Sequence, residues 1–139
     1  FVLMFQREVV ERITAEIGNS ERGFLTVLVE NYVETKKLFD VPPTAFRPSP
    51  KVWSAVVSIL PKSEFTVSDE KLFRDLVSAA FMQKRKTIQN NLKNFRKALE
   101  IDWQKIFENT RIEPNRRAET LSIYEWRKLF ENIENNEKD

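Results

Sequence analysis

Residues 46–57 read Phe46-Arg47-Pro48-Ser49-Pro50-Lys51-Val52-Trp53-Ser54-Ala55-Val56-Val57, a proline-rich loop that leads directly into a strand. Proline fixes its own φ at about −65° and favours extended conformations in the residue before it. With two further prolines at positions 42 and 43, the loop is predicted to be rigid and to hold Phe46 in a set direction. From Val52 to Leu60 the apolar side chains alternate, which predicts a half-buried strand closed by Pro61.

The chain before this loop predicts an α/β arrangement. Residues 1–5 are continuously apolar, which is typical of a strand buried on both faces of a parallel sheet. Residues 7–17 have the spacing of an amphipathic helix that ends at the turn 18–20. Residues 23–32 fit neither period, and their β-branched content favours a strand. A short strand at 36–41 is expected to pair antiparallel with 52–60.

After Pro61 the period changes from two to 3.6, and residues 62–68 have the polar composition of a linker. We therefore expect two domains, 1–61 and 62–139, of which the second is all helical. Ser68, Thr87 and Asp102 are predicted to cap successive helices, the second of them running through Leu99. The last helix has the S-x-x-E capping box of Ser122 and Glu125.

Composition excludes several classes of chemistry. The 139 residues contain no cysteine and no histidine, so Ser-His and Cys-His mechanisms and disulfides are excluded and no metal site is expected. With only two glycines, a glycine-rich phosphate loop is not expected in this chain. No run has the length of a membrane span and no signal peptide is visible, so a soluble cytoplasmic protein is expected. The chain opens with Phe1 inside an apolar run, which predicts the C-terminal part of a longer protein.

Positive charge is concentrated although the net charge is only +2. Between Phe81 and Lys97 there is no acid, and the stretch carries the cations Lys84, Arg85, Lys86, Lys93, Arg96 and Lys97. A short basic run alone is equally compatible with an ordinary surface turn and with phosphate binding. The absence of acids, together with asparagines at 90, 91 and 94, favours contact with an RNA or DNA backbone.

The position of Phe46 in the sequence allows two interpretations of its role. A lone phenylalanine is most often a core residue, but one held between prolines and next to Arg47 and Lys51 is also a platform on which a displaced base could stack. Trp53, Trp103 and Trp126 fall within apolar periods and are expected in the core or at an interface.

Four segments in order resemble the KsgA family of small-subunit ribosomal RNA adenine dimethyltransferases. They are Gln6-Arg7-Glu8-Val9-x-Glu11-Arg12, Val41-Pro42-Pro43-x-Ala45-Phe46-x-Pro48-x-Pro50-Lys51-Val52, Ala80-Phe81-x-Gln83-x-Arg85-Lys86-Thr87-x-x-Asn90-x-Leu92 and Arg117-Ala118-Glu119-x-Leu121-Ser122. Trp53 stands where many members have Asp, and Gln89 where many have Arg. Erythromycin-resistance methyltransferases share an F-x-P-x-P-K-V-like segment, but the Gln83–Leu92 motif favours the small-subunit family.

The resemblance implies the last third of a doubly wound S-adenosylmethionine-dependent methyltransferase domain, followed by a small helical domain that binds rRNA. It implies N6-dimethylation of two adjacent adenines near the 3′ end of small-subunit rRNA by a monomeric enzyme, and a helix at 23–32. The cofactor loop and the Asn-(Leu/Ile)-Pro-Tyr motif would lie upstream of Phe1, so this chain alone is expected to be inactive. The alternative is a non-catalytic rRNA-binding or ribosome-assembly module.

The resemblance also assigns site residues. Phe46 matches the aromatic residue thought to stack on the target adenine. Lys84, Arg85, Lys86, Arg116 and Arg117 fall where the family's helical domain is basic and are expected to contact rRNA phosphates. Arg47 and Lys51, beside Phe46, and Lys93 and Arg96, in the acid-free stretch, are also expected to bind RNA.

Overall fold

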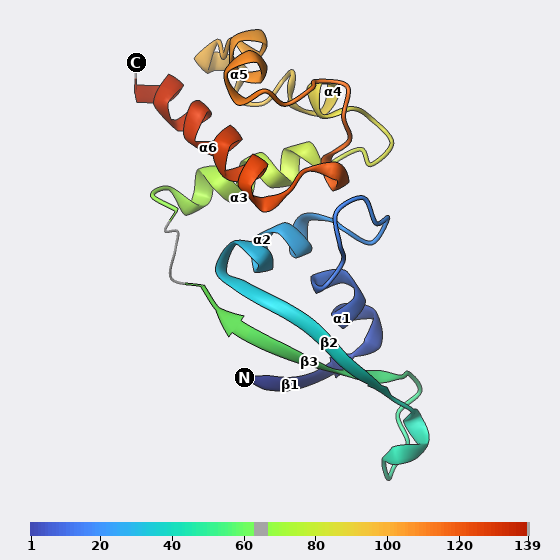
Figure 1. Ribbon diagram of the computed structural model, residues 1–139. Coiled ribbons are helices and arrows are strands. Elements are labelled where there is room, and N and C mark those ends of the chain that lie inside the picture. Colours follow the sequence, from blue (N-terminus) through green and yellow to red (C-terminus); the bar gives the residue numbers. More distant parts are fainter. Residues whose placement is uncertain (63–66, 139) are drawn as a thin grey trace. The chain divides into compact units, whose positions relative to one another are not determined.

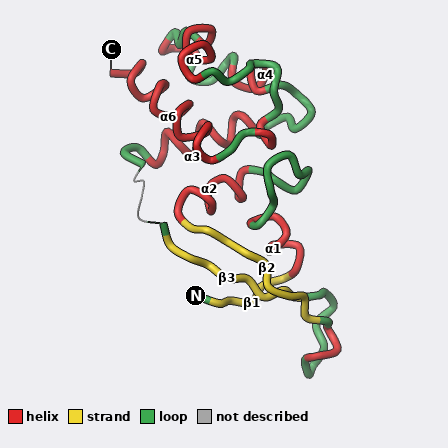
Figure 2. Tube along the Cα trace, viewed as in Figure 1, coloured by secondary structure: helices red, strands yellow, loops and turns green. Residues whose placement is uncertain are grey.

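The structure is a computed structural model that describes residues 1–62 and 67–138 (Figures 1 and 2). The chain divides into two compact units, Phe1–Thr66 and Val67–Asp139. The division falls within the segment expected to be a linker, of which residues 63–66 lie outside the described part of the chain. The assignment of the two units to catalysis and to rRNA binding stays a prediction.

The first unit contains a small mixed arrangement of strands and helices. Its elements are β1 (Val2–Gln6), α1 (Arg7–Ile13), α2 (Phe24–Tyr32), β2 (Val33–Val41), a 3₁₀ turn (Pro43–Ala45) and β3 (Ser54–Pro61). The sheet order is β1-β3-β2, and β3 is antiparallel to both neighbours. The predicted antiparallel pairing of the two strands around the proline loop is confirmed, with β2 longer than expected.

Two helices in this unit differ from what the hydrophobic periodicity and the β propensity predict. The first, α1, ends at Ile13 rather than residue 17, and the Thr14 hydroxyl donates to the Val10 carbonyl at 2.7 Å. Residues 24–32 are helical, as the resemblance implied and against their strand propensity. The α2 helix buries Val27, while the Gly23 N–H at its start donates to the Thr26 hydroxyl at 3.0 Å.

The core of the first unit lies between the helices and one face of the sheet. Val10 and Ile13 of α1 pack on Ala55 and Val57 of β3. Because side chains alternate across a strand, Val56 and Leu60 point to the opposite face. Met4 pairs with Val56, so it shares that face and is itself exposed.

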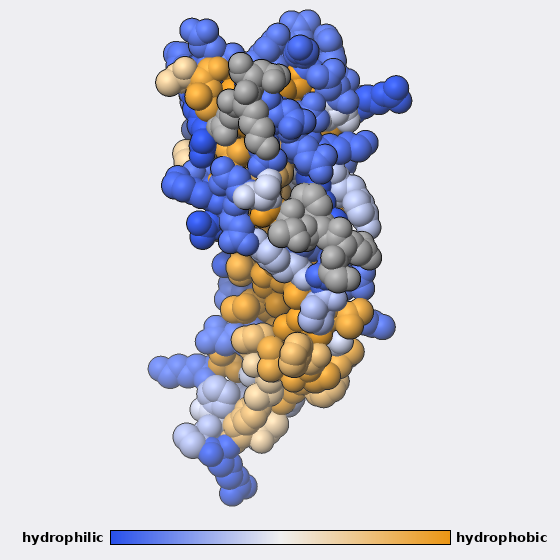
Figure 3. Space-filling model, turned by 90° about the vertical axis from the view of Figure 1, so that its left-hand side faces the viewer, coloured by the Kyte–Doolittle hydropathy of each residue, from blue (hydrophilic) through white to orange (hydrophobic). Residues whose placement is uncertain are grey.

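The expectation that residues 1–5 are buried in a parallel sheet is wrong for this structure. All residues of β1 are exposed, and the strand pairs antiparallel with β3. The physical reason is its position at the sheet edge, where no described residue of the same unit covers its outer side or the second face of the sheet. Figure 3 shows hydrophobic side chains gathered on this side of the molecule, at the height of the strands in Figure 1.

An ion pair with a fully buried arginine also holds the first unit, and no sequence pattern predicts it. The Arg22 side chain is fully buried and donates to both carboxylate oxygens of Glu30, at 2.8 and 2.9 Å. It also donates to the Ala15 carbonyl at 3.3 Å, so it ties the segment after α1 to α2. A buried charge with two charge-assisted hydrogen bonds to its partner is costly to leave unpaired.

The second unit is helical, as expected. Its elements are α3 (Glu70–Ala80), α4 (Ile88–Leu92), a 3₁₀ turn (Lys97–Leu99), α5 (Trp103–Thr110), a 3₁₀ turn (Ala118–Thr120) and α6 (Ile123–Lys138). Trp126 of α6 is fully buried and stacks with Phe81 at a centroid distance of 5.7 Å. Phe73 of α3 meets Phe130 of α6 edge to face at 5.6 Å. The core of this unit therefore centres on α3 and α6.

Three of the four predicted caps are confirmed. Thr87 accepts from the Asn90 N–H and Asp102 from the Lys105 N–H, while Ser122 and Glu125 form the reciprocal capping box. The cap of α3 is Asp69, which accepts from the Leu72 N–H at 3.0 Å, and not Ser68, whose hydroxyl bonds to the Glu134 carboxylate. A carboxylate and a hydroxyl are both good caps, so sequence alone does not separate adjacent candidates.

The second predicted helix is shorter than expected. It ends at Leu92 instead of continuing through Leu99, and Arg96 has a left-handed φ of 44°. A non-glycine residue rarely adopts this conformation, and it is incompatible with a continuous helix. As a result Phe95 is only half-buried and Leu99 is exposed.

Candidate nucleic-acid interface

Hydrogen bonds within the proline loop hold the backbone of Phe46. Phe46 is extended (φ −118°, ψ 155°), and its N–H donates to the Pro43 carbonyl at 3.2 Å, which closes the 3₁₀ turn. The Ser49 hydroxyl donates to the Phe46 carbonyl at 3.1 Å, and the Arg47–Pro48 peptide bond is cis. Both backbone groups of Phe46 are thus held within the loop, and the residue is half-buried.

The basic residues of this loop are exposed. Arg47 lies next to Phe46, and Lys51 lines a hollow of about 410 Å³ with Arg7 and Trp53. Trp53 is 41% exposed and so lies outside the core, which leaves an interface as its predicted place; the Arg7 guanidinium covers its ring at 4.9 Å. The Arg7 N–H also donates to the Trp53 carbonyl at 2.9 Å, which ties the start of α1 to the end of the loop. The structure therefore brings Lys51 close to a second cation, Arg7, which was not among the predicted RNA-binding residues.

The basic turn of the second unit lies between α3 and α4. Lys84, Arg85 and Lys86 are all exposed, as expected for a helix junction. Asn91 holds this turn: its amide nitrogen donates to the carbonyls of Ala80 (2.9 Å) and Gln83 (3.0 Å), and its amide oxygen accepts from the Gln83 N–H at 3.1 Å. Asn91 was expected to donate to nucleic acid, but it uses both amide atoms inside the protein. It positions the cations instead of adding to them.

The other predicted cations divide into exposed and internally engaged groups. Lys93 and Arg117 are exposed. Arg96 is half-buried and its guanidinium reaches the Asp75 carboxylate at 3.4 Å. The pKa of Asp75 lies below its ordinary value, first because Lys71 donates to it at 2.8 Å and further because of Arg96.

Arg116 contacts other residues of the helical unit through both its side chain and its backbone. Its guanidinium pairs with the Glu125 carboxylate and donates to the Thr120 carbonyl at 2.6 Å. Its backbone carbonyl accepts from the Ile88 N–H at 2.7 Å, so it also connects the turn 113–117 to the start of α4. These contacts make Arg116 a scaffold residue in the free protein, beside the exposed Arg117.

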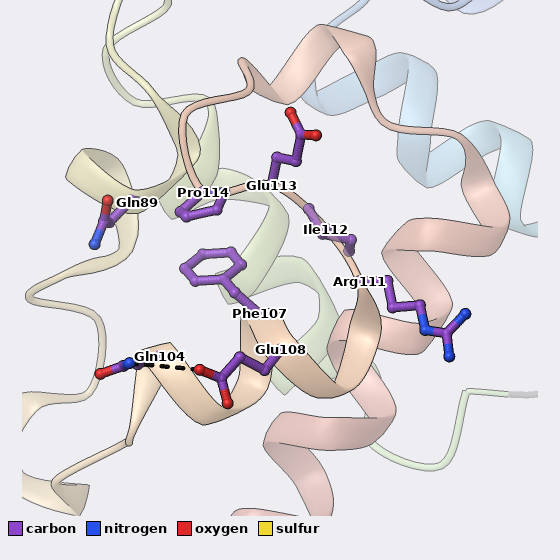
Figure 4. A pocket seen from close by; sticks show the side chains of 8 residues that line it. All are labelled: Gln89, Gln104, Phe107, Glu108, Arg111, Ile112, Glu113 and Pro114. Carbon is purple, nitrogen blue, oxygen red and sulfur yellow. Dashed lines mark hydrogen bonds between the residues drawn. The ribbon is translucent and has the colours of Figure 1, made fainter.

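A separate cavity of about 450 Å³ lies between α4, α5 and the following turn (Figure 4). Phe107, Ile112 and Pro114 supply its apolar surface, and Gln104 donates to Glu108 at 3.4 Å near its rim. None of these residues was among the predicted site residues.

Two features of the described residues bear on cofactor and metal binding, namely the surroundings of the glycines and the grouping of acidic side chains. Gly18 and Gly23 lie in open surroundings, since a Cβ added at either would meet nothing within 4 Å. Within the described ranges, 1–62 and 67–138, there is no group of three or more potential metal-ligating His, Cys, Asp or Glu side chains. In the same ranges no helix is long and apolar enough to cross a membrane.

Comparison with known proteins agrees with the sequence motifs. The model of the ribosomal RNA adenine dimethylase family matches residues 1–129. Ribosomal RNA small subunit methyltransferase A of Staphylococcus aureus strain MRSA252 is 43% identical over 94% of the chain, and that of strain JH9 is 42% identical over the same share. The chain spans 46% of the length of each of these relatives.

Solved structures show the same fold. A dimethyladenosine transferase from Plasmodium falciparum has a TM-score of 0.84 at 24% identity and covers 97% of this chain and 57% of its own. The 23S rRNA methyltransferase ErmE has a TM-score of 0.63 at 20% identity, over 96% of this chain and 54% of its own. On the family match and the staphylococcal identities, the chain belongs to the ribosomal RNA adenine dimethylase family.

Proposed function

We propose that the whole protein uses S-adenosylmethionine to dimethylate N6 of two adjacent adenines near the 3′ end of small-subunit rRNA. Family membership supports the reaction class, and the observation that carries the role of this chain is the constrained loop that presents Phe46. An enzyme that modifies a base turns it out of the helix and holds it by stacking. In this proposal the Phe46 ring forms one wall of the site for the turned-out adenine.

We further propose that residues 1–61 are the C-terminal part of the methyltransferase domain. The exposed apolar edge strand β1 and the uncovered second face of the sheet support this, because water-exposed apolar surface of this kind normally marks an interface. The chain also spans only about half the length of its staphylococcal relatives. The cofactor-binding and Asn-Pro-Tyr motifs would then lie in the part that precedes Phe1.

In the second unit, the exposed cations Lys84, Arg85, Lys86, Lys93 and Arg117 would contact rRNA phosphates, with Arg47 and Lys51 doing so beside the Phe46 loop. Such contacts set affinity and register without reading sequence. Arg96 and Arg116 would contribute by holding the surface in shape, since both guanidinium groups reach carboxylates of the same unit.

The test compares the full-length protein with this chain on unmethylated small subunits, using a methyl-labelled cofactor. We expect label on two adjacent adenines with the full-length protein and none with the chain alone. Methyl transfer by the chain itself would contradict the placement of the cofactor site, and full-length protein that labels another nucleotide would contradict the substrate.

The second candidate is a non-catalytic module that binds rRNA, and the exposed turn 84–86 favours it because three adjacent exposed cations could bind phosphates without any catalytic step. Under this alternative, reversing the charge of Lys84, Arg85 and Lys86 abolishes binding to small subunits, while Phe46→Ala leaves both binding and cell function intact. Under the enzymatic proposal Phe46→Ala lowers methylation.

A further inference from the structure

Beside the basic turn lies a hollow of about 470 Å³, which we call the α4 hollow. Lys86, Asn90, Asn91, Lys93 and Asn94 line it, with Met82 and Gln83 at the turn. Its volume is within the range of about 300–1,000 Å³ that is usual for ligand sites. It is distinct from the Phe46 loop, which belongs to the other compact unit.

The shape of the α4 hollow is fixed before any ligand binds. Asn91 fastens the turn at Ala80 and Gln83 through its three hydrogen bonds, and Thr87 caps α4 through the Asn90 N–H at 3.2 Å. On its other side α4 is anchored by the Gln89 N–H, which donates to the Pro114 carbonyl at 3.1 Å. A preformed site loses less conformational entropy on binding.

The charge of the hollow suits an anion. Its lining contains two lysines and no acid. Lys84 and Arg85, which are exposed in the same turn, add positive charge at its border. Neighbouring like charges with no acid between them raise the local concentration of a polyanion.

The amide side chains indicate which kind of phosphate-containing ligand fits the hollow. Asn90 and Asn94 are exposed and line the hollow together with the two lysines. An amide side chain offers both a donor and an acceptor, whereas a phosphate diester only accepts. The ribose 2′-hydroxyl is both donor and acceptor, and it is the group that distinguishes RNA from DNA.

We propose that the α4 hollow binds a ribose-phosphate segment of RNA, with Lys86 and Lys93 on phosphates and the amides of Asn90 and Asn94 on ribose 2′-hydroxyls. The proposal rests on the proposed function in taking RNA as the ligand. It adds that the helical unit distinguishes RNA from DNA by itself, at named asparagines.

The experiment measures binding of the 139-residue chain to an RNA hairpin from the 3′ end of small-subunit rRNA and to the DNA hairpin of the same sequence, at several salt concentrations. We expect the unchanged chain to prefer RNA. Asn90→Ala with Asn94→Ala should weaken RNA binding about tenfold, leave DNA binding unchanged and keep the salt dependence, because uncharged hydrogen bonds are lost. Lys86→Ala with Lys93→Ala should weaken both complexes and make the slope of log affinity against log salt shallower by about 0.9 per lysine.

Matched controls are Asn109→Ala and Lys105→Ala, which alter exposed residues of α5 outside the hollow. Both should bind like the unchanged chain, and circular dichroism should show all variants folded. Equal affinity of the unchanged chain for RNA and DNA, or an RNA preference that survives loss of both asparagines, overturns the proposal. These results are independent of methyl transfer. If the full-length protein methylates normally but the chain shows no preference for RNA, this inference is wrong and the proposed function still stands.

Discussion

The guanidinium group of Arg116 is paired with the carboxylate of Glu125, the same carboxylate that caps α6 by accepting from the Ser122 N–H at 3.0 Å. One acid thus closes the capping box and neutralises an arginine that was expected to bind RNA. Because Arg116 also bonds to Thr120, the contacts join the 3₁₀ turn 118–120 to the last helix.

Substitution of Arg116 is therefore predicted to lower the stability of the fold, whereas substitution of its neighbour Arg117 is predicted to lower RNA binding. Arg116→Ala removes charge-assisted hydrogen bonds from a partly buried site and should lower the free energy of unfolding of the helical unit by about 1.5–3 kcal/mol. Arg117→Ala alters an exposed side chain and should change it by less than about 0.5 kcal/mol, while weakening RNA binding. Denaturant unfolding followed by tryptophan fluorescence, with binding measured on folded protein, checks both, since two of the three tryptophans, Trp103 and the buried Trp126, lie in the helical unit. Equal stability of the two variants would show that the Arg116 contacts do not stabilise the fold.

The same pair predicts a pH dependence. Partial burial acts to raise the pKa of Glu125, but hydrogen bonds from Arg116 and Ser122 outweigh it, and the pKa lies below its ordinary value. A lowered folded-state pKa means that the stabilisation is complete above the pKa of the unfolded chain and is lost as the pH falls through the folded-state pKa. Glu125→Gln should be less stable than the unchanged chain at neutral pH, and the difference should shrink in acid. Denaturation midpoints across this acidic range provide the measurement; a constant difference would contradict the pKa shift.

Local chemistry explains which parts of the fold could be predicted. The caps at Thr87, Asp102 and Ser122 depend on residues three positions apart, so the sequence determines them almost alone. The β2–β3 pair was predictable for a similar reason, because prolines mark the connection and alternation marks β3. By contrast, α2 overrides its strand propensity, which only packing of Val27 or knowledge of the family could reveal.

The candidate site shows the same limit. Sequence identified the cations, but not which of them pair within the protein: Arg116 meets Glu125 and Arg96 meets Asp75 across turns that periodicity does not describe. The exposure of β1 depends equally on what lies across the sheet, so a continuous apolar run predicted its strand but not its surroundings.

Asn91 and Asn90 are adjacent, but only Asn91 uses its side chain to stabilise the basic turn. Asn91→Ala removes three hydrogen bonds that fasten the basic turn, so we expect a loss of about 1–3 kcal/mol in stability and a looser turn. Asn90→Ala keeps the cap, which uses its backbone N–H, and should leave stability within about 0.5 kcal/mol. Amide hydrogen exchange at Gln83 should accelerate in the Asn91 variant only. Unchanged exchange there would mean that the turn is held by other contacts.

The last prediction concerns Phe46 in the full-length protein. If its ring stacks on the turned-out adenine, Phe46→Ala loses about 1–3 kcal/mol of base stacking and should lower kcat/KM for methylation roughly 5- to 150-fold, whereas Phe46→Trp should retain most activity. Thr44→Ala, an exposed residue in the same loop, is the matched control and should behave like the unchanged enzyme. Binding to small subunits should fall little in Phe46→Ala, because phosphate contacts from the helical unit dominate affinity. Since the Phe46 backbone is held by Pro43 and Ser49, the alanine variant should keep the loop in place. A Phe46→Ala enzyme with normal kcat/KM would show that the loop serves the fold and not the adenine.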